Sequence, residues 1–445
     1  MKRRLRFVFP AACLAAIFAS SGRAETVKDR EGAVRNDRAS HESGSVWVYN
    51  DVEKGFAQAK STGKPLLVVL RCVPCLACAG IDGQVLMENS ALSPLLNQFV
   101  PVRLINANAI DLTRFQFDYD LSFSTLFFNA DGTLYGRYGS WTHQKNPEDT
   151  DTASFRRALE RVLALHRGYP ANRGQLAGKQ GAPSPFKTPV EIPSLAEKYT
   201  RDLDWEGPVV KSCVHCHMIG DAHRALYREK GEPIPMEWLY PHPSPETIGL
   251  TLSPEHAARV DAVAPDSIAA KAGFLSGDDI EIFGGQPLVS LADFGWVLHR
   301  APDAGRLEAS VRRGSDLKPI AIELPAEWRF AAAEPRRVAT WGLRGMATGG
   351  LRLLDLTDEE RAARGFGNSE MALRIDFVGQ YNKHAAAKKA GFKMDDIIVL
   401  VDGMSGRMSE GELMGRLIRA HRAGETVKVS LRRGDREMEL TLPMQ

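Results

Sequence analysis

Two tight groups of cysteines are the residues in this chain whose types and spacing best suit chemistry. One group is Cys213-Val-His-Cys216-His217, in which two thiols are separated by two residues and followed at once by a histidine. This is the attachment pattern of a c-type haem, because each thiol can add to one porphyrin vinyl group while the histidine ligates the iron. The sequence therefore predicts haem c on Cys213, Cys216 and His217, and no nucleotide. A redox dithiol, and a zinc site that adds His223, are the alternatives.

The second group is Cys72-Val-Pro-Cys75-Leu-Ala-Cys78. Thiols at this spacing can exchange disulfides, with a thiolate as the attacking species. A domain with incidental cysteines is one alternative. A metal or iron–sulfur site is another, although no fourth cysteine is nearby. Once a leader is removed, five cysteines remain, and an odd number in two clusters is unlike a structural disulfide framework.

The N-terminus predicts export. Residues 1–24 begin with basic side chains, continue through the apolar run Phe7–Ala19 and end in small residues, which is typical of a cleaved signal peptide. A lipoprotein signal at Cys13 is the alternative. The run is too short for a transmembrane span and no other apolar run is long enough, so we expect a periplasmic chain with no transmembrane segment once the leader is cleaved. Residues 25–45 are polar and predict a flexible leader.

Composition permits several domains and narrows the choice of partners. The chain has 445 residues, 44% hydrophobic content and a formal net charge of +2. That length could hold roughly three domains of ordinary size. A near-neutral charge without a long basic tract argues against nucleic acid as a partner.

The pattern around the upstream cysteines predicts an α/β domain over residues 46–167, whose elements would position these thiols. The pattern predicts a helix over Val52–Thr62, a buried central strand over Leu66–Leu70 and a further strand over Phe99–Ile105. Asn129-Ala-Asp-Gly132 predicts a hairpin turn, and a closing helix follows from about residue 152 to 166.

This order, with Lys64-Pro65 before the central strand, resembles an exported thioredoxin-like domain. The resemblance places the family's redox pair on Cys75 and Cys78, with Cys72 as an additional thiol. It implies that the pair lies at a helix start, which lowers a thiol pKa, and that Cys75 attacks while Cys78 resolves.

The chain departs from that family at three positions. Pro74 stands where a tryptophan is usual, Val69 where many members have a buried acid, and Ser124 where the family has a cis-proline. These departures put ordinary reductase activity in doubt.

Residues 168–194 are rich in proline and glycine and predict a linker. Residues 195–247 carry the predicted haem site as a short cytochrome-c-like segment. Met236 follows Pro233-Ile-Pro235, which resembles the methionine loop of small cytochromes, so it is the first candidate for the sixth iron ligand, before His242 and His223.

An internal repeat fills the C-terminal half. Lys271-Ala-Gly273-Phe recurs as Lys389-Ala-Gly391-Phe, and Arg-Arg-Gly314 recurs as Arg-Arg-Gly434. Both copies resemble PDZ domains of the bacterial type, over residues 248–325 and 339–444. In the second copy, Asp395 stands where the family usually has glycine.

The resemblance to PDZ domains implies that protein or peptide C-termini bind beside an exposed strand, where backbone N–H groups hold the terminal carboxylate. The expected binding loop is Ile248-Gly249-Leu250 in the first copy. In the second it is Trp341-Gly342-Leu343 or Gly349-Gly350-Leu351. The alternative is that these domains only pack against their neighbours or form dimers.

The whole order is similar to a group of exported bacterial (seleno)proteins that combine a thioredoxin-like domain with PDZ domains. The sequence thus predicts a multidomain chain of α/β and mainly-β domains. Its expected function is thiol–disulfide exchange together with haem electron transfer, with a redox partner protein and with the client held by the PDZ domains. The alternative is a non-enzymatic periplasmic scaffold.

Overall fold

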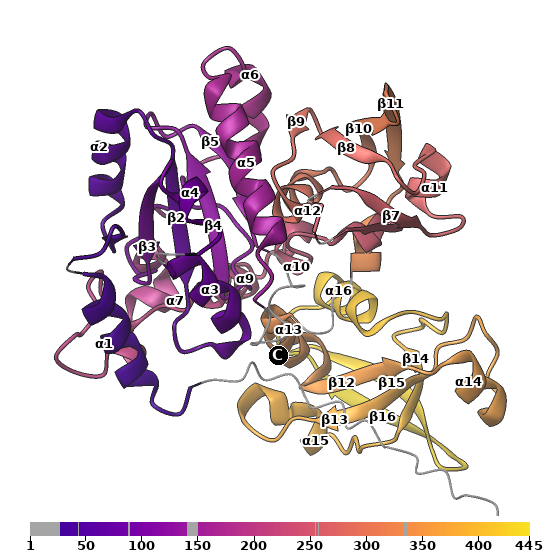
Figure 1. The fold of residues 1–445 in the computed structure, drawn as a ribbon. Coiled ribbons are helices and arrows are strands. Elements are labelled where there is room, and N and C mark those ends of the chain that lie inside the picture. Colours follow the sequence, from indigo (N-terminus) through magenta and orange to yellow (C-terminus); the bar gives the residue numbers. More distant parts are fainter. Residues whose placement is uncertain are drawn as a thin grey trace, which may run out of the picture.

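The computed structural model describes residues 27–42, 44–87, 90–139, 150–253, 255–256, 258–332 and 337–445. The predicted signal peptide lies outside these ranges. Figure 1 shows three domains, with the N-terminal one in indigo and purple, the middle one in salmon and the C-terminal one in orange and yellow. In the described part of the chain no helix is both long and apolar enough to cross a bilayer.

The N-terminal domain is built on a five-stranded mixed sheet of order β1-β3-β2-β4-β5. Its strands are β1 (Val48–Tyr49), β2 (Leu66–Arg71), β3 (Val100–Leu104), β4 (Phe123–Phe128) and β5 (Leu134–Tyr138). Its helices are α1 (Arg30–His41), α2 (Val52–Thr62), η1 (Leu76–Cys78), α3 (Ala79–Leu86), α4 (Ser93–Leu96) and α5 (Ala153–Arg167). The predicted strands, helices and hairpin of this domain are confirmed to within two residues at each end.

Local chemistry explains these boundaries. The Asp51 side chain accepts from the backbone N–H of Lys54 at the start of α2, and Gly63 ends that helix with φ of 69°. Every residue of β2 is buried, as a central strand requires. Gly132 closes the hairpin turn with φ of 89°.

The segment expected to be a flexible leader instead contains helix α1. Its Asp37 is nearly buried and pairs with Arg103 on β3. A polar sequence becomes ordered here because its carboxylate neutralises a buried guanidinium, a long-range contact that composition does not reveal.

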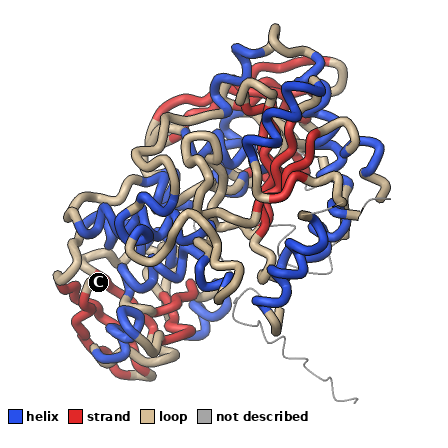
Figure 2. The backbone as a smooth tube through the Cα atoms, turned by 90° about the vertical axis from the view of Figure 1, so that its left-hand side faces the viewer, coloured by secondary structure: helices blue, strands red, loops and turns tan. Residues whose placement is uncertain are grey.

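Residues 168–247, the connecting segment, are neither a loose linker nor a separate cytochrome-like core. They form short helices, namely α6 (Arg173–Leu176), η3 (Ala177–Lys179), η4 (Pro189–Glu191), α7 (Pro193–Ala196), α8 (Val209–Ser212), the longer α9 (Cys216–Glu229) and α10 (Met236–Leu239). Val214, Ile219 and Ala222 pack into the core on one face of the N-terminal sheet, the face that α2 also covers. Helices α3 and α5 cover the other face. Figure 2 shows helices and loops, and few strands, between this sheet and the C-terminal domain.

The middle domain runs from η5 to η6. Its elements are η5 (Pro245–Ile248), β6 (Leu250–Leu252), β7 (Val260–Val263), α11 (Ile268–Ala272), β8 (Asp279–Phe283), β9 (Gln286–Pro287), α12 (Leu291–Arg300), β10 (Gly305–Arg313), β11 (Asp316–Leu324) and η6 (Trp328–Ala332). Strands β6 and β7 pair separately from the four-stranded sheet β11-β10-β8-β9.

The C-terminal domain has a five-stranded antiparallel sheet of order β12-β13-β14-β15-β16. Its elements are α13 (Val338–Thr348), β12 (Leu351–Asp355), α14 (Asp358–Arg364), β13 (Leu373–Val378), η7 (Asn382–Ala385), α15 (Ala386–Lys389), β14 (Ile397–Val401), α16 (Glu410–Ala420), β15 (Thr426–Arg433) and β16 (Arg436–Pro443). Strand β12 is at the edge of this sheet.

The internal repeat is confirmed by equivalent contacts in the two domains. Arg313 donates to Asp278 at 2.7 Å, and Arg433 donates to Asp396 at the same distance. Asp395 adopts a left-handed φ of 65°, where Gly277 of the first copy has 89°. The departure from glycine at this turn is therefore accommodated with some backbone strain.

Candidate thiol site

The upstream cysteines follow the end of β2. The Cys72 N–H donates to Ser122 O at 2.9 Å, and the Cys75 N–H donates to Cys72 O at 3.0 Å, which makes a tight turn. Cys75 caps η1, and Cys78 follows at the start of α3. The pair thus lies where the strand turns into a helix, as the sequence predicted.

Both thiols of the pair are shielded from solvent, and Cys75 is the more accessible. Cys75 is 9% exposed and Cys78 is 1% exposed. The Cys78 Sγ lies 2.9 Å from Ser122 Oγ, a partner that the sequence analysis missed. Burial raises the pKa of Cys78 to about 12, although Arg71 opposes the shift. For Cys78 the desolvation cost outweighs the lowering that we expected from a helix start.

A buried charge network supports the cysteine turn. Arg71 donates to Asp82 at 3.1 Å and to Cys75 O at 2.6 Å. Asp82 also accepts from Arg103 at 2.8 Å, and Arg103 in turn pairs with Asp37. The two guanidinium groups hold the pKa of Asp82 below its ordinary value, against the opposing effect of burial. The sequence signal for this network is the presence of a charged residue, Arg71 or Arg103, near the end of an otherwise apolar strand.

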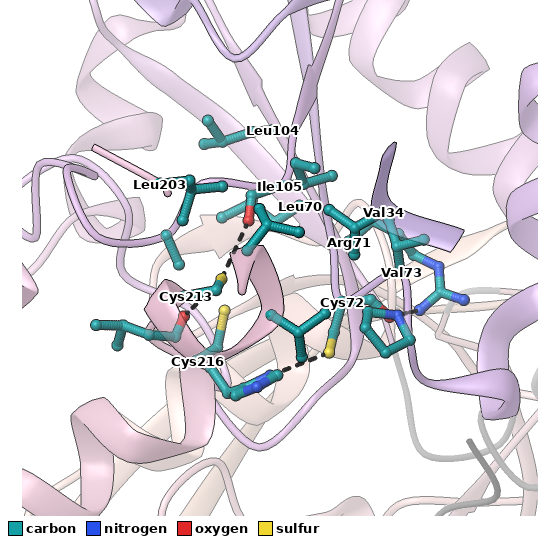
Figure 3. Close-up of a pocket in the computed structure, with 16 residues that line it drawn as sticks. Val34, Leu70, Arg71, Cys72, Val73, Leu104, Ile105, Leu203, Cys213 and Cys216 are labelled. Atoms are coloured by element: carbon teal, nitrogen blue, oxygen red, sulfur yellow. Dashed lines mark hydrogen bonds between the residues drawn. The ribbon is translucent and has the colours of Figure 1, made fainter. Parts of the chain in front are cut away.

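The structure brings the two cysteine groups together. Cys72, Cys213 and Cys216 line one cavity, together with apolar residues such as Leu70 and Leu104 (Figure 3). His215 joins them, because its Nδ1 lies 3.4 Å from Cys72 Sγ. The five cysteines in the described part of the chain are all free thiols. His215 lies inside the Cys-X-X-Cys spacing, and the sequence pattern alone indicated no role for it.

The cavity is apolar enough to keep these groups neutral. Burial raises the pKa of Cys72 to about 11 and that of Cys213 to about 12, and it also raises that of Cys216. Proximity to Cys72 adds to the shift at both downstream thiols. Burial lowers the pKa of His215 to about 4, so its imidazole is neutral near pH 7.

The cavity as packed does not fit a haem. Its volume of about 40 Å³ leaves space for a few water molecules and none for a porphyrin. Cys213 Sγ faces the carbonyl oxygen of Ile105 at 3.7 Å, so the sheet itself forms the wall opposite that thiol. Haem c on Cys213, Cys216 and His217 therefore stays a prediction that requires this wall to open.

The predicted iron ligands have other partners. His217 Nδ1 lies 3.7 Å from Asp221 on the next turn of α9. Met236 packs in the core of the C-terminal domain, and Arg419 donates to its Sδ at 3.2 Å. Cys216 packs instead against the N-terminal core. Within the described ranges, no group of three or more His, Cys, Asp or Glu side chains is arranged to hold a metal ion.

The predicted loop of the middle domain has the expected backbone shape. Gly249 adopts φ of 87° between η5 and β6, and an added Cβ would lie 2.2 Å from Ser267 Cβ. Ile248 and Leu250 on either side are buried in the domain core. This position therefore requires glycine.

In the C-terminal domain, the choice of Trp341-Gly342-Leu343 as a binding loop is wrong. These residues lie inside helix α13, where backbone N–H groups already donate along the helix. The loop before β12 is Gly349-Gly350, with φ of 57° and 93°. The second option that the sequence left open, Gly349-Gly350-Leu351, thus lies in the loop before the edge strand.

The backbone donors around this loop are already used. Gly350 N–H donates to Arg344 O at 2.9 Å, and Gly349 N–H caps the same helix. Leu353 N–H on edge strand β12 donates at 2.8 Å to the Glu410 carboxylate, which also accepts from Arg344. Helix α13 and Glu410 of α16 therefore occupy the amides that a peptide terminus would need.

A cavity of about 190 Å³ remains between β12 and α16. Leu353, Met414 and Ile418 line it from the domain itself, and Tyr240 closes it from the connecting segment. Tyr240 donates to Gly411 O at 2.7 Å and lies where an added Cβ on Gly415 would clash. This groove could take an apolar side chain.

Comparison with known proteins finds two of the expected domain families. Residues 47–130 match the thioredoxin-like family, and residues 370–444 match the PDZ domain family. No curated protein sequence matches the chain. Among solved structures, a variant of the HtrA-type protease AlgW with a decapeptide aligns at 15% identity with a TM-score of 0.20. That alignment covers 31% of this chain and 40% of the protease chain.

Proposed function

We propose that this protein is an exported redox protein that exchanges thiols and disulfides at Cys75 and Cys78, with its PDZ domains holding the polypeptide client. The observation that carries the proposal is the placement of this pair. It lies at the strand-to-helix turn of a thioredoxin-like domain, with the more accessible Cys75 preceding the buried Cys78.

The proposed reaction transfers two electrons to a client disulfide. The Cys75 thiolate attacks one client sulfur, which forms a mixed disulfide and releases the other client sulfur as a thiol. Cys78 then passes its proton to the departing sulfur and attacks Cys75, which releases the reduced client and leaves a Cys75–Cys78 disulfide. Ser122 Oγ, at 2.9 Å from Cys78 Sγ, would orient the resolving thiol.

The PDZ domains would present the client to this pair. The groove between β12 and α16 supports an apolar side chain, and the Gly349-Gly350 turn has the shape of a carboxylate loop. Because α13 uses the loop amides, we expect peptide binding at the C-terminal domain to require movement of that helix.

Exchange with a fluorogenic glutathione disulfide tests this proposal on the full exported chain. Cys75→Ser should abolish turnover, and Cys78→Ser should trap a glutathione adduct visible by intact mass. Met87→Ser is a matched control, because it removes an exposed sulfur side chain just after α3 and should leave turnover unchanged.

The same variants separate the redox function from the scaffold alternative. Turnover that survives Cys75→Ser contradicts the proposal. A wild-type chain that exchanges no disulfide, yet captures peptides equally well after serine replaces Cys72, Cys75 and Cys78, would favour the scaffold.

A further inference from the structure

We propose that Cys213 and Cys216 form a second redox dithiol, and that Cys72 passes disulfides between this dithiol and the Cys75/Cys78 pair. The inference rests on the proposed function of Cys75 and Cys78. Its basis is that Cys72 of the upstream group and both downstream cysteines line one apolar cavity (Figure 3). Cys213 and Cys216 lie outside the residues that either family model matches.

Cys72 is placed to contact both pairs. On one side it shares the turn with Cys75, whose N–H donates to Cys72 O at 3.0 Å, and proximity to Cys75 adds to the raised pKa of Cys72. On the other side its side chain points into the cavity that Cys213 and Cys216 line, and proximity to Cys72 adds to the raised pKa of both of these thiols.

The geometry of the downstream segment supports the exchange. His215 Nδ1 lies 3.4 Å from Cys72 Sγ, which holds that sulfur beside the downstream dithiol. Cys216 is the first residue of the 14-residue helix α9, and it lines the same cavity as Cys72 and Cys213.

The exchange balances without an additional reactant. Cys72 attacks Cys75 in the Cys75–Cys78 disulfide, which forms a Cys72–Cys75 bond and releases Cys78 as a thiol. One sulfur of the Cys213/Cys216 dithiol then attacks Cys72 and frees Cys75. The other sulfur completes a Cys213–Cys216 disulfide and frees Cys72. Two electrons have then moved from the downstream dithiol to the upstream pair. An external dithiol would reduce the Cys213–Cys216 disulfide to begin the next cycle.

The size of the cavity limits which reagents can reach the downstream sulfurs. Its volume of about 40 Å³ excludes large thiol reagents. Cys72, Cys213 and Cys216 are each partly exposed, whereas Cys75 and Cys78 are buried, so a small external dithiol can reach the downstream pair to reduce it again.

Time-resolved disulfide mapping tests the relay. The fully reduced exported chain is mixed with one equivalent of oxidised glutathione, quenched by alkylation and mapped by peptide mass. The Cys75–Cys78 disulfide should form first and the Cys213–Cys216 disulfide later. Cys72→Ser should slow the second step on the order of tenfold or more while leaving the first step in place.

Three outcomes would overturn the relay. They are an equally fast second step in Cys72→Ser, a Cys75–Cys78 disulfide that never moves to Cys213 and Cys216, and a haem absorption band with matching covalent mass on those two residues. Failure of the first step would instead contradict the proposed function.

Packing controls accompany the relay test. Val73→Ala trims another wall of the cavity and should keep the wild-type rate, which separates loss of sulfur from loosening of the wall. Cys72→Ala repeats the test without a hydroxyl. Thermal unfolding of each variant verifies that the chain is folded.

Discussion

At the scale of single residues, desolvation sets the protonation of most groups near the thiols and at the domain junctions. The rings of His242 and His299 stack at 4.4 Å, and burial lowers the pKa of each well below 6.5. Arg337 adds to the shift at His242, and Arg329 adds to that at His299. Both imidazoles are therefore neutral in the folded chain over a pH range in which the unfolded chain binds protons.

This histidine pair should make stability depend on pH. Because both pKa values are depressed in the folded chain, the two histidines contribute fully to the free energy of unfolding above about pH 6.5. This contribution is lost as the pH falls from there toward the pKa values of the folded chain. In that window, each pH unit of acidification should lower the free energy of unfolding by about 1.4 kcal/mol per histidine. Urea unfolding at about pH 7, 6 and 5 measures the slope. His299→Asn should reduce it, and an identical slope in that variant would contradict the assignment.

At the scale of elements, helix α13 decides whether the C-terminal PDZ domain can bind a peptide. It places Arg344 against Glu410 of α16 at 2.6 Å, and the same carboxylate binds the β12 edge at Leu353. The arrangement covers an edge strand with the protein's own side chains, which protects it from pairing with another chain.

Removing the Glu410 carboxylate should open this edge. Glu410→Ala frees the Leu353 N–H and removes the carboxylate that pairs with Arg344, so affinity for a peptide with an apolar C-terminal residue should rise several-fold. Stability should fall by about 3–5 kcal/mol, because a buried charge loses its partner. Fluorescence anisotropy and urea unfolding measure the two effects. Glu412→Gln, on the same helix, is the control, and equal affinity in wild type and Glu410→Ala would count against the closed-groove interpretation.

At the scale of the whole molecule, the connecting segment joins all three domains. Lys179 from that segment donates to Asp293 of α12 at 2.7 Å, and Asp293 also accepts from the Arg137 N–H of β5 at 3.1 Å. Lys179 and Asp293 have no solvent exposure. Burial holds the pKa of Lys179 below its ordinary value, although the pairing with Asp293 opposes this shift.

Asp293→Asn should therefore loosen the junction between the N-terminal and middle domains. The amide keeps the shape but leaves Lys179 without a counter-charge, and we expect a loss of about 3–5 kcal/mol in unfolding free energy. Glu281→Gln, in the exposed pair with Arg312, should cost less than about 1 kcal/mol. Urea unfolding compares the two variants, and equal losses would refute the junction role.

The sequence by itself determined the local structure and the repeat. The apolar run of β2, the turn ending at Gly132 and the recurrence of Gly273 at Gly391 depend on backbone preferences and short-range patterns, which neighbouring residues establish. The placement of Cys75 and Cys78 at a strand-to-helix turn came from the resemblance to thioredoxin-like domains.

Only the tertiary structure decided which distant groups meet. His215 lies 143 positions from Cys72 in the chain yet contacts its sulfur. That contact exists because Val214 and Ile219 pack on one face of the N-terminal sheet, beside the strand end from which Cys72 projects. Likewise, Trp341 lies in helix α13 rather than in a loop, and its ring stacks on His384, which is distant in the sequence. The packing of apolar faces determines which residues distant in the sequence come into contact. The spacing of residues along the chain does not reveal these contacts.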